Sequence, residues 1–301
     1  MTFDASADTL RERRPRLVVP RNACDTHVHF FDRRFPEAAT ATKATPPDVW
    51  VDDYRAIQRR LGTTRVVVVQ PTTYGLDNAC QAEAAACFGD DACLVVVVDD
   101  SVTDDELRRL TALGARGTRF FMVSGGAVPW EAMAPVADRV ARYGWHIELH
   151  LNGRDLPDRI SLLHSLPVPV VIDHVGRFMD PVEIDHPSFI ALLQLLETGR
   201  FWVKLSAPYV NSRSGPPRFS DVGVLARELA RRFPERMVWA SNWPHPGQPG
   251  HPDEADLLDL LVEWVDSEAT RHRILVDNPA ELYGFPVAAE VLVAGSVGDH
   301  E

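Results

Sequence analysis

The chain has 301 residues, of which 45% are hydrophobic and 25% are charged, and its formal net charge is −12. This composition is typical of a globular protein with a large core, and the excess of negative charge argues against nucleic acid as a partner. No stretch approaches the roughly 18 consecutive apolar residues that a membrane span needs, so we expect no membrane partner.

The two ends of the chain differ from its middle. Residues 1–20 lack the apolar core of a signal peptide, and we expect a loose lead-in there. Residues 21–286 contain no low-complexity linker and predict a single domain, followed by a tail at 287–301. The four cysteines have neither CxxC nor zinc-finger spacing. We therefore expect a reduced, cytoplasmic protein.

Short apolar runs recur along the chain with helical stretches between them. The runs are rich in Val and Ile and nearly continuous in apolar character, which is typical of strands buried on both faces. They cover residues 23–30, 65–70, 93–99, 115–122, 145–151, 169–174, 201–207 and 237–243.

Three of the intervening stretches predict helices clearly, at 103–114, 128–144 and 219–234. The first begins with Thr103 as a cap, continues with acidic residues and stops at Gly114. Eight successive strand–helix units predict an α/β fold, a (β/α)₈ TIM barrel. A doubly wound open sheet is the alternative, but it often carries a Gly-rich phosphate turn, which is absent from this sequence.

A barrel places catalytic groups at the carboxyl ends of its strands. His27 and His29 are two residues apart in the first run, so both side chains point to one face. Further unusual polar residues fall at or just beyond the ends of later runs. The expected site residues are His27, His29, Gln70, Arg119, His150, His174, Arg177, Ser206, Asn242 and His245.

Each of these residues also has a structural interpretation. A single histidine in an apolar strand is more often a hydrogen-bonded core residue than a ligand, and Arg119 alone could equally be structural. Histidines at the ends of three predicted strands are not expected by chance in a chain with eleven histidines. We therefore predict a functional cluster.

The spacing of these histidines resembles a metal site that lacks one member. An HxH pair on the first strand, with histidines on the fifth and sixth and a carboxylate on the eighth, can hold zinc. Here "WASNWPHP" (239–246) supplies Asn242, whose neutral amide is no general base and is a weaker ligand. We expect that no metal is required. If a divalent metal such as zinc binds, His27, His29 and His150 are its expected ligands.

Several ordered motifs resemble the amidohydrolase superfamily. They are "CDTHVHFFD", "VVVVQPTTYGLDN", "GARGTRF", "GWHIELHL", "VIDHVGR", "WVKLSAPY", "WASNWPHP" and "LVDNPAELYGF". They are most similar to the 2-pyrone-4,6-dicarboxylate lactonase and sugar-lactonase branch, which includes galactarolactone isomerase-like proteins. The similarity spans roughly residues 20–285.

This resemblance implies a barrel enzyme that acts on lactones. By position it implies that His27, His29 and His174 are catalytic histidines. It implies that Asn242 replaces the water-activating Asp of the hydrolases, and that Arg119 and Arg177 bind the substrate carboxylate. Four more strand-end residues complete the expected substrate site, namely Gln70, His150, Ser206 and His245.

The sequence also departs from the dicarboxylate lactonases of this branch. It has Ala44 where they have Tyr, and Gly125 and Val210 near where they have additional arginines. A substrate with two carboxylates needs several cationic partners, so we expect a different substrate. Three loop arginines are the alternative source of positive charge, Arg154, Arg213 and Arg218.

Asn242 leaves more than one activity open. We expect hydrolysis of a carboxylate-bearing or sugar-acid lactone, with His174 or His29 as the base. Isomerisation of a lactone by attack of a substrate hydroxyl is the main alternative, since an amide in place of Asp disfavours water. A zinc-dependent decarboxylase and a non-catalytic binder of an organic acid are further alternatives. The sequence leaves open whether Asn242 is natural and whether the protein is a homo-oligomer.

Overall fold

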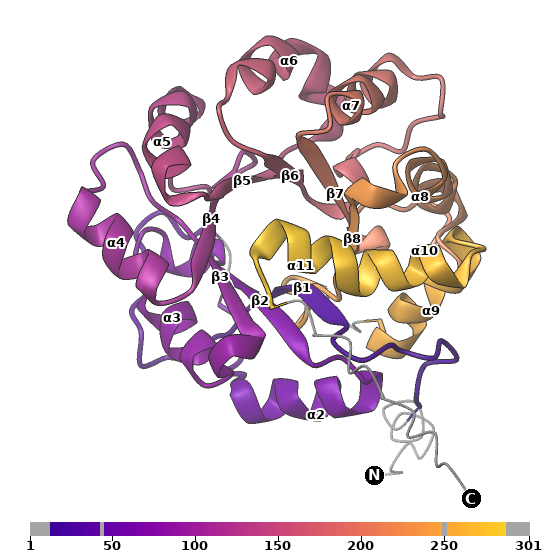
Figure 1. Ribbon diagram of the computed structural model, residues 1–301, viewed down its shortest axis with the longest axis horizontal. Helices are drawn as coiled ribbons and strands as arrows, with labels where there is room; N and C mark the ends of the chain where they lie inside the picture. The colour runs from indigo at the N-terminus through magenta and orange to yellow at the C-terminus, as the bar shows by residue number, and fades with distance from the viewer. Residues whose placement is uncertain (1–12, 43–44, 249–251, 287–301) are drawn as a thin grey trace, which may run out of the picture.

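Eight parallel strands form one sheet that curves into a barrel (Figure 1). The computed structural model describes residues 13–42, 45–248 and 252–286. Each strand pairs with its neighbours in chain order, which confirms the predicted (β/α)₈ architecture. The strands are β1 (Cys24–Val28), β2 (Arg65–Val69), β3 (Ala92–Val96), β4 (Ala115–Phe121), β5 (His146–His150), β6 (Val170–Ile172), β7 (Phe201–Leu205) and β8 (Met237–Trp239).

The barrel closes between β1 and the segment that follows β8. His29 N donates to Trp243 O at 2.9 Å, and Asn242 N donates to His27 O at 3.1 Å. One carboxylate strengthens this seam, because Asp25 Oδ1 accepts from Ser241 N at 2.9 Å. The closure therefore holds the HxH pair beside Asn242.

The helices surround the strands (Figure 1). In α4, Leu107 and Leu110 are buried while Arg108 and Arg109 are exposed, which is the pattern of a helix packed on one face. Thr103 caps this helix by accepting from Glu106 N at 3.2 Å, as expected. The α-helices are α2 (Val51–Leu61), α3 (Ala79–Ala86), α4 (Asp104–Ala112), α5 (Met133–Val140), α6 (Leu156–Ser165), α7 (Pro187–Glu197), α8 (Ser220–Arg232), α9 (Glu254–Trp264), α10 (Glu268–His272) and α11 (Asn278–Tyr283).

Five strands end two or more residues earlier than the sequence predicts, namely β1, β3, β6, β7 and β8. The backbone after β6 and β8 shows the reason. Instead of running over 169–174 and 237–243, β6 ends at Ile172 and β8 ends at Trp239. The residues beyond them adopt left-handed backbone conformations, with φ 54° at His174 and φ 62° at Asn242. This conformation cannot continue a strand, and few non-glycine residues adopt it outside strained or functional sites.

One predicted helix is also shorter than expected. The stretch 128–144 contains α5 flanked by two short 3₁₀ turns, Trp130–Ala132 and Ala141–Tyr143. Pro135 lies in the first turn of α5, where a missing N–H costs little. The prediction of a helical segment is confirmed, but its α-helical part is only eight residues long.

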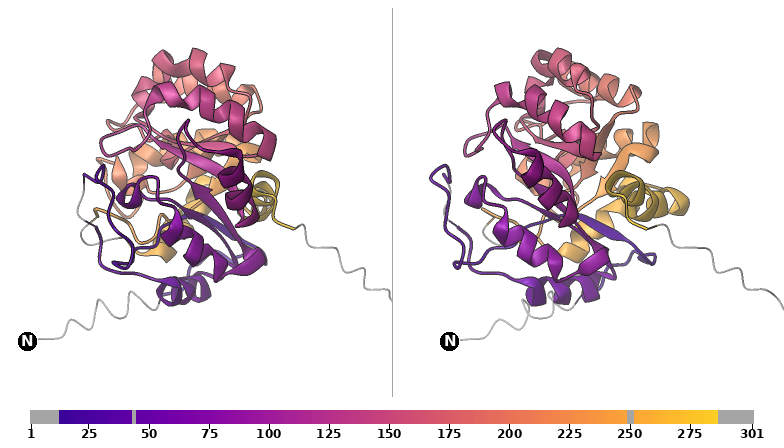
Figure 2. Two further views of the ribbon diagram at one scale, coloured as in Figure 1. Left: turned by 90° about the vertical axis from the view of Figure 1, so that its left-hand side faces the viewer. Right: turned by 60° about the vertical axis from the view of Figure 1, so that its left-hand side comes forward.

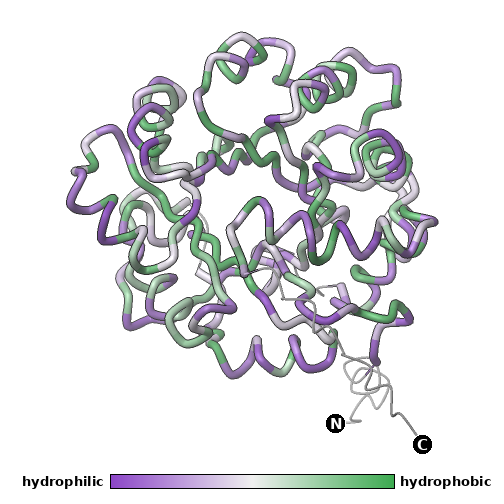
Figure 3. Tube along the Cα trace, viewed as in Figure 1, coloured by the Kyte–Doolittle hydropathy of each residue, from purple (hydrophilic) through white to green (hydrophobic). Residues whose placement is uncertain are grey.

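The two ends of the barrel differ in what covers them. In both views of Figure 2 the long loop after β1 lies at one end and α11 lies at the other. Tyr283 and Phe285 pack on Cys24 and Cys93 at the amino end of the strands, so α11 closes this end. Apolar stretches follow the strands, while the outer helices alternate between apolar and polar residues (Figure 3).

The chain before β1 contacts α9, where Asp259 accepts from the backbone of Arg16 and Leu17 at 2.7 and 3.0 Å. Residues 1–12 of the expected lead-in and the tail at 287–301 lie outside the described residues. Within the described parts of the chain, no helix has both the length and the apolar character needed to cross a membrane. The four cysteines are free thiols.

Candidate active site

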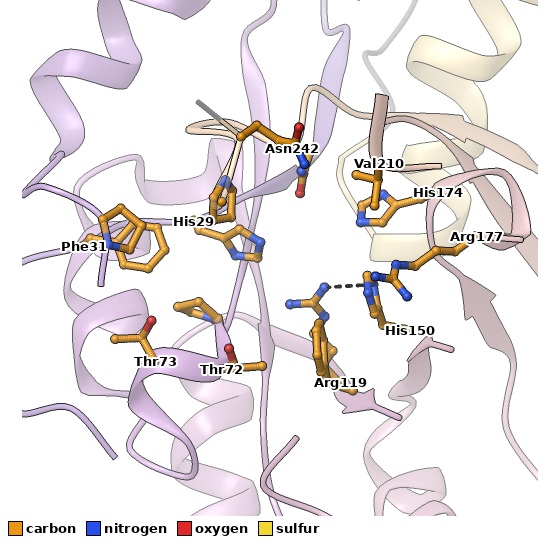
Figure 4. Close-up of a pocket in the computed structure, with 16 residues that line it drawn as sticks. His29, Phe31, Thr72, Thr73, Arg119, His150, His174, Arg177, Val210 and Asn242 are labelled. Atoms are coloured by element: carbon orange, nitrogen blue, oxygen red, sulfur yellow. Dashed lines mark hydrogen bonds between the residues drawn. The ribbon is translucent and has the colours of Figure 1, made fainter. Parts of the chain in front are cut away.

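A cavity of about 150 Å³ lies at the carboxyl ends of the strands (Figure 4). Six of the predicted site residues line it, His29, Arg119, His150, His174, Arg177 and Asn242. They come from β4, β5 and the segments after β1, β6 and β8. The structure thus brings together residues up to 213 positions apart in the chain (242 minus 29).

The other four predicted residues lie behind the pocket lining. His27 is covered by His29, with 3.1 Å between their Nε2 atoms. The Gln70 amide donates to the backbone oxygens of Gly75 and Asp77. Ser206 Oγ lies 2.8 Å from His174 Nδ1. His245 Nδ1 lies 2.8 Å from the Tyr209 hydroxyl. In the described structure these residues support the pocket lining rather than form it.

The hydrogen bonds of the HxH pair fix where its protons lie. His29 Nδ1 lies 2.7 Å from Val69 O and must donate to it, because a carbonyl only accepts. Lys204 Nζ donates to His27 Nδ1 at 2.9 Å. The proton of neutral His27 is therefore on Nε2, from which it is donated to His29 Nε2.

A buried ion pair lies beneath these histidines. Lys204 Nζ is 2.5 Å from Glu148 Oε2 and also donates to Thr26 O at 2.8 Å. Both charged side chains are fully buried. Burial raises the pKa of Glu148 to about 7, although the charge of Lys204 opposes this rise. Neither residue was assigned a role from the sequence, because their pairing depends on β5 and β7 meeting across the barrel.

Asp173 is a second buried carboxylate that the predicted site lacks. Its Oδ2 accepts from Arg119 Nη2 and from His150 Nδ1, each at 3.0 Å. Burial alone would raise the pKa of Asp173, but His27, His174 and Arg119 lower it well below its usual value. Its position immediately before His174 was the available signal, since a carboxylate beside a site histidine commonly orients it.

The three histidines that line the cavity are neutral at physiological pH. Burial, with the nearby charge of Arg119, lowers the pKa of His29 to about 3. Burial also lowers the pKa of His150 to about 3, and it lowers that of His174 well below 6.5. His150 and His174 both have Nδ1 hydrogen-bonded, to Asp173 and Ser206 respectively. Their Nε2 atoms are therefore the ones left for a ligand.

Arg177 differs from Arg119 in its partners. Arg119 Nη1 donates to Gln70 O at 3.2 Å and Nη2 donates to Asp173, so much of its guanidinium is occupied. Arg177 is 9% exposed, and its Nε and Nη1 have no hydrogen-bond partner in the described chain. Burial lowers the pKa of this guanidinium. A buried cation of this kind requires an anionic or strongly accepting ligand.

The three loop arginines have acidic partners outside the pocket lining. Arg154 Nη2 is 3.3 Å from Asp180 Oδ2, and Arg213 also pairs with Asp180. Arg218 Nε is 3.9 Å from Glu263. None of these three arginines lines the cavity as described.

Comparisons with known proteins agree with this geometry. The family model described as amidohydrolase matches residues 24–285. The chain belongs to the amidohydrolase family. It is 34% identical to a D-galactarolactone isomerase of Agrobacterium fabrum (strain C58 / ATCC 33970), over 91% of this chain and 96% of that protein. It is also 34% identical to a 2-pyrone-4,6-dicarboxylate hydrolase of Comamonas testosteroni, over 90% of this chain and 92% of that protein.

A solved structure shows the same fold. An apo crystal structure of an Agrobacterium tumefaciens protein superposes with a TM-score of 0.86 at 33% identity, covering 90% of this chain and 99% of that one. The predicted branch of the amidohydrolases is therefore confirmed by sequence and by fold.

Many amidohydrolases bind a metal, and one group of residues in this chain has the composition of a metal site. His27, Asp173 and His174 each offer a ligand atom within 4.8 Å of the others. The bonding pattern fits a divalent ion poorly, because the proton on His27 Nε2 and Lys204 at Nδ1 occupy both ring nitrogens. Arg119 already pairs with Asp173. A further dication would add two charges beside two buried cations.

Proposed function

We propose that this amidohydrolase acts on the ester carbonyl of a carboxylate-bearing or sugar-acid lactone, and that its main reaction is hydrolysis. The observation that carries the proposal is the Arg177 guanidinium, whose Nε and Nη1 have no partner among the described residues, in a cavity lined by neutral histidines. The names of its relatives, a lactone isomerase and a pyrone dicarboxylate hydrolase, support the same substrate class.

The charges around the cavity support an anionic substrate. Arg119, Arg177 and Lys204 are positive, and Glu148 and Asp173 are negative when ionised. With neutral histidines these five groups sum to one positive charge, three minus two. A substrate carboxylate at Arg177 would cancel this charge and give its Nε and Nη1 groups acceptors.

Hydrolysis needs a group that takes a proton from the attacking water. His29 Nε2 already accepts from His27, which leaves His174 as the better placed of the two expected bases. In the proposed tautomer His174 Nδ1 donates to Ser206 Oγ, which leaves the lone pair of Nε2 to take the proton. Burial lowers the pKa of His174, while the neighbouring Asp173 charge opposes this effect and stabilises the protonated form that the step creates. General-base catalysis typically contributes about 10²–10⁴-fold.

The proposed step conserves atoms and charge. The water oxygen bonds to the lactone carbonyl carbon while its proton moves to His174 Nε2. Arg119 stabilises the negative charge that forms on the carbonyl oxygen. The bond from the carbonyl carbon to the ring oxygen then breaks, and the proton returns from His174 to the ring oxygen. The product is a hydroxy acid.

Isomerisation is a second candidate that one specific observation favours. Asn242 lines the cavity where an acidic residue would activate water, and an amide cannot take that proton. Attack by a hydroxyl of the substrate has a high effective concentration, so it needs less help from a base. The relative named as a lactone isomerase is in line with this alternative.

We further propose that the reaction requires no metal. Protein stripped with a chelator should keep its activity, and added zinc should not bind stoichiometrically. Loss of activity on chelation, restored by zinc, would favour the metal-dependent decarboxylase instead. The buried, unpaired Cys24, Cys80 and Cys93 support a cytoplasmic enzyme.

A panel of 1,4- and 1,5-lactones of sugar acids, followed by NMR, tests the proposal. The protein should open or rearrange at least one lactone, and Asn242→Asp should shift the products toward hydrolysis. Saturable binding without any product from either protein would indicate a non-catalytic binder. Products that are unchanged in Asn242→Asp would refute the role of this residue.

A further inference from the structure

A chain of side-chain hydrogen bonds runs from the cavity to the outside of the barrel. Asn242 Nδ2 lies 2.8 Å from the Tyr209 hydroxyl, which lies 2.8 Å from His245 Nδ1. His245 Nε2 lies 3.2 Å from Glu254 Oε1. The other oxygen of Glu254 pairs with Arg60. Tyr209 and His245 do not line the cavity, whereas Asn242 does.

The far end of this chain is a carboxylate. Burial would raise the pKa of Glu254, but the hydrogen bond from His245 and the charges of His245 and Arg60 lower it. Glu254 is therefore ionised and can only accept. His245 donates to it from Nε2, and its Nδ1 holds the Tyr209 hydroxyl in place.

The bond to Tyr209 fixes the amide of Asn242. The Asn242 atom that faces the Tyr209 hydroxyl is Nδ2, which can only donate, so the hydroxyl oxygen accepts from it. The Asn242 side-chain oxygen is then turned away from Tyr209. Figure 4 shows Asn242 across the cavity from Arg119 and His150, with His29 and His174 between them.

We propose that Tyr209 and His245 are positioning residues that hold the side-chain oxygen of Asn242 toward the cavity, where it accepts a hydrogen bond from a hydroxyl group of the substrate. This inference rests on the proposed function and narrows it. The oxygen needs an O–H donor, which a carboxylate lacks, so the substrate is a lactone with both a carboxylate for Arg177 and a free hydroxyl for Asn242.

The structure gives a physical reason for such selectivity. A lactone without the hydroxyl would leave the Asn242 oxygen desolvated and unpaired, which a site built for a hydroxyl group discriminates against strongly. A neutral acceptor also cannot remove the proton of that hydroxyl outright. Asn242 therefore selects and orients the hydroxyl, while proton transfer remains with the histidines.

The test compares a hydroxylated 1,4-lactone of a sugar dicarboxylic acid with its analogue lacking the ring hydroxyl. Wild-type protein should prefer the hydroxylated lactone in kcat/KM. Tyr209→Phe keeps the ring but removes the hydroxyl that holds the amide. It should lower this preference about three- to tenfold, the value of one hydrogen bond, with the loss confined to the hydroxylated lactone.

Two further variants sharpen the comparison. Tyr143→Phe is the matched control, because the Tyr143 hydroxyl bonds Asp104 O away from the cavity, and its preference should equal that of wild type. In Glu254→Gln the amide can donate or accept, so the direction of its bond to His245 is no longer fixed and His245 is held less firmly. This variant should lower the preference in the same sense as Tyr209→Phe, which a purely structural defect would not do.

A spectroscopic measurement separates this inference from the proposed function. The side-chain amide signals of Asn242 are identified by their loss in Asn242→Asp. They should shift in Tyr209→Phe and stay unchanged in Tyr143→Phe. If wild-type protein turns over no lactone but the Asn242 signals shift in Tyr209→Phe, the proposed lactone chemistry is wrong while the positioning of Asn242 by Tyr209 holds. An unchanged preference in Tyr209→Phe, or unshifted signals, would overturn the inference.

Discussion

Two arginines reach the same cavity, but their partners give them different tasks. Arg119 is held by Asp173 and by Gln70 O, so it is fixed in place before any ligand arrives. Arg177 has unpaired Nε and Nη1 groups and a left-handed backbone with φ 45°. Strain and an unsatisfied cation at one residue are typical of a binding position rather than of a structural one.

Replacement of Arg177 by Gln should weaken binding of a carboxylate-bearing lactone or organic acid. The loss should be about ten- to a hundredfold in Kd, the usual value of a hydrogen bond to a charged group. Isothermal titration measures it. Arg213→Gln is the matched control, since that arginine pairs with Asp180 on an exposed loop. Equal losses in both variants would contradict the assignment.

At the scale of residues, the sequence predicts the residues that line the cavity better than the residues that hold them in place. His29, Arg119, His150, His174, Arg177 and Asn242 were predicted because they combine an unusual residue type with a strand end, and all six line the cavity. Asp173, Glu148, Lys204 and Tyr209 were given no role. Their functions depend on which strands face each other across the barrel, and spacing along one strand does not contain that information.

At the scale of elements, the seam between β1 and β8 determines the geometry of the site. Asp25 Oδ1 accepts from Ser241 N at 2.9 Å and from His27 N at 3.3 Å, while Oδ2 accepts from the Tyr54 hydroxyl at 3.0 Å. One buried carboxylate therefore joins β1, α2 and the segment that carries Asn242.

Asp25→Ala should destabilise the protein by about 3 kcal/mol or more, because buried donors lose their acceptor. Asp25→Asn keeps an oxygen for the two backbone N–H groups, and its NH₂ can donate to Tyr54, so its cost should be clearly smaller. Urea unfolding monitored by tryptophan fluorescence measures both changes. Similar free energies of unfolding for the two variants would argue against this role.

The ends of β6 and β8 show where prediction of elements fails. Apolar periodicity indicated that the strands exist, but it extended them to His174 and Trp243. The left-handed residues His174, Val175 and Asn242 stop them earlier. Such backbone is accessible to Asn242 but unfavourable for Val175, a β-branched residue, so tertiary packing must maintain it after β6.

At the scale of the whole molecule, the number of buried titratable groups is unusual. Burial lowers the pKa of His29, His146 and His150 to about 3 and that of His27 and His174 well below 6.5. It raises the pKa of Asp25 to about 6 and that of Glu148 to about 7. The barrel is therefore sensitive to acid.

The direction of this effect follows from proton binding. Below pH 6.5 the unfolded chain protonates five histidines that the folded chain keeps neutral, while the folded chain holds protons on Asp25 and Glu148. The net excess in the unfolded state is three protons, five minus two. Stability should fall as pH decreases from about 6.5 toward 4.5, by roughly 1 kcal/mol per pH unit for each excess proton.

Urea unfolding across this pH range tests the prediction. His146→Leu removes one buried histidine that does not line the cavity and packs against Tyr283, with 5.3 Å between ring centroids. The pH dependence should become shallower by about one proton. A wild-type stability that is flat between pH 6.5 and 4.5 would contradict this account.

The overall architecture was the most predictable level, because eight repeated strand–helix units allow few folds. The charge arrangement inside the barrel was not predictable in the same way. A net charge of −12 gave no sign that the cavity itself is positive. That local charge arises only when Arg119, Arg177 and Lys204 come together from β4, the segment after β6, and β7.

The central claim is that a nucleophile attacks a lactone carbonyl in this cavity, and incubation of sugar-acid lactones in ¹⁸O-labelled water tests it most directly. Hydrolysis predicts a hydroxy acid with one ¹⁸O atom in its new carboxylate, detected by mass spectrometry. A rearranged lactone without ¹⁸O would indicate the isomerase alternative. If the folded wild-type protein leaves every lactone unchanged and unlabelled, the claim that a nucleophile attacks a lactone carbonyl in this cavity is wrong.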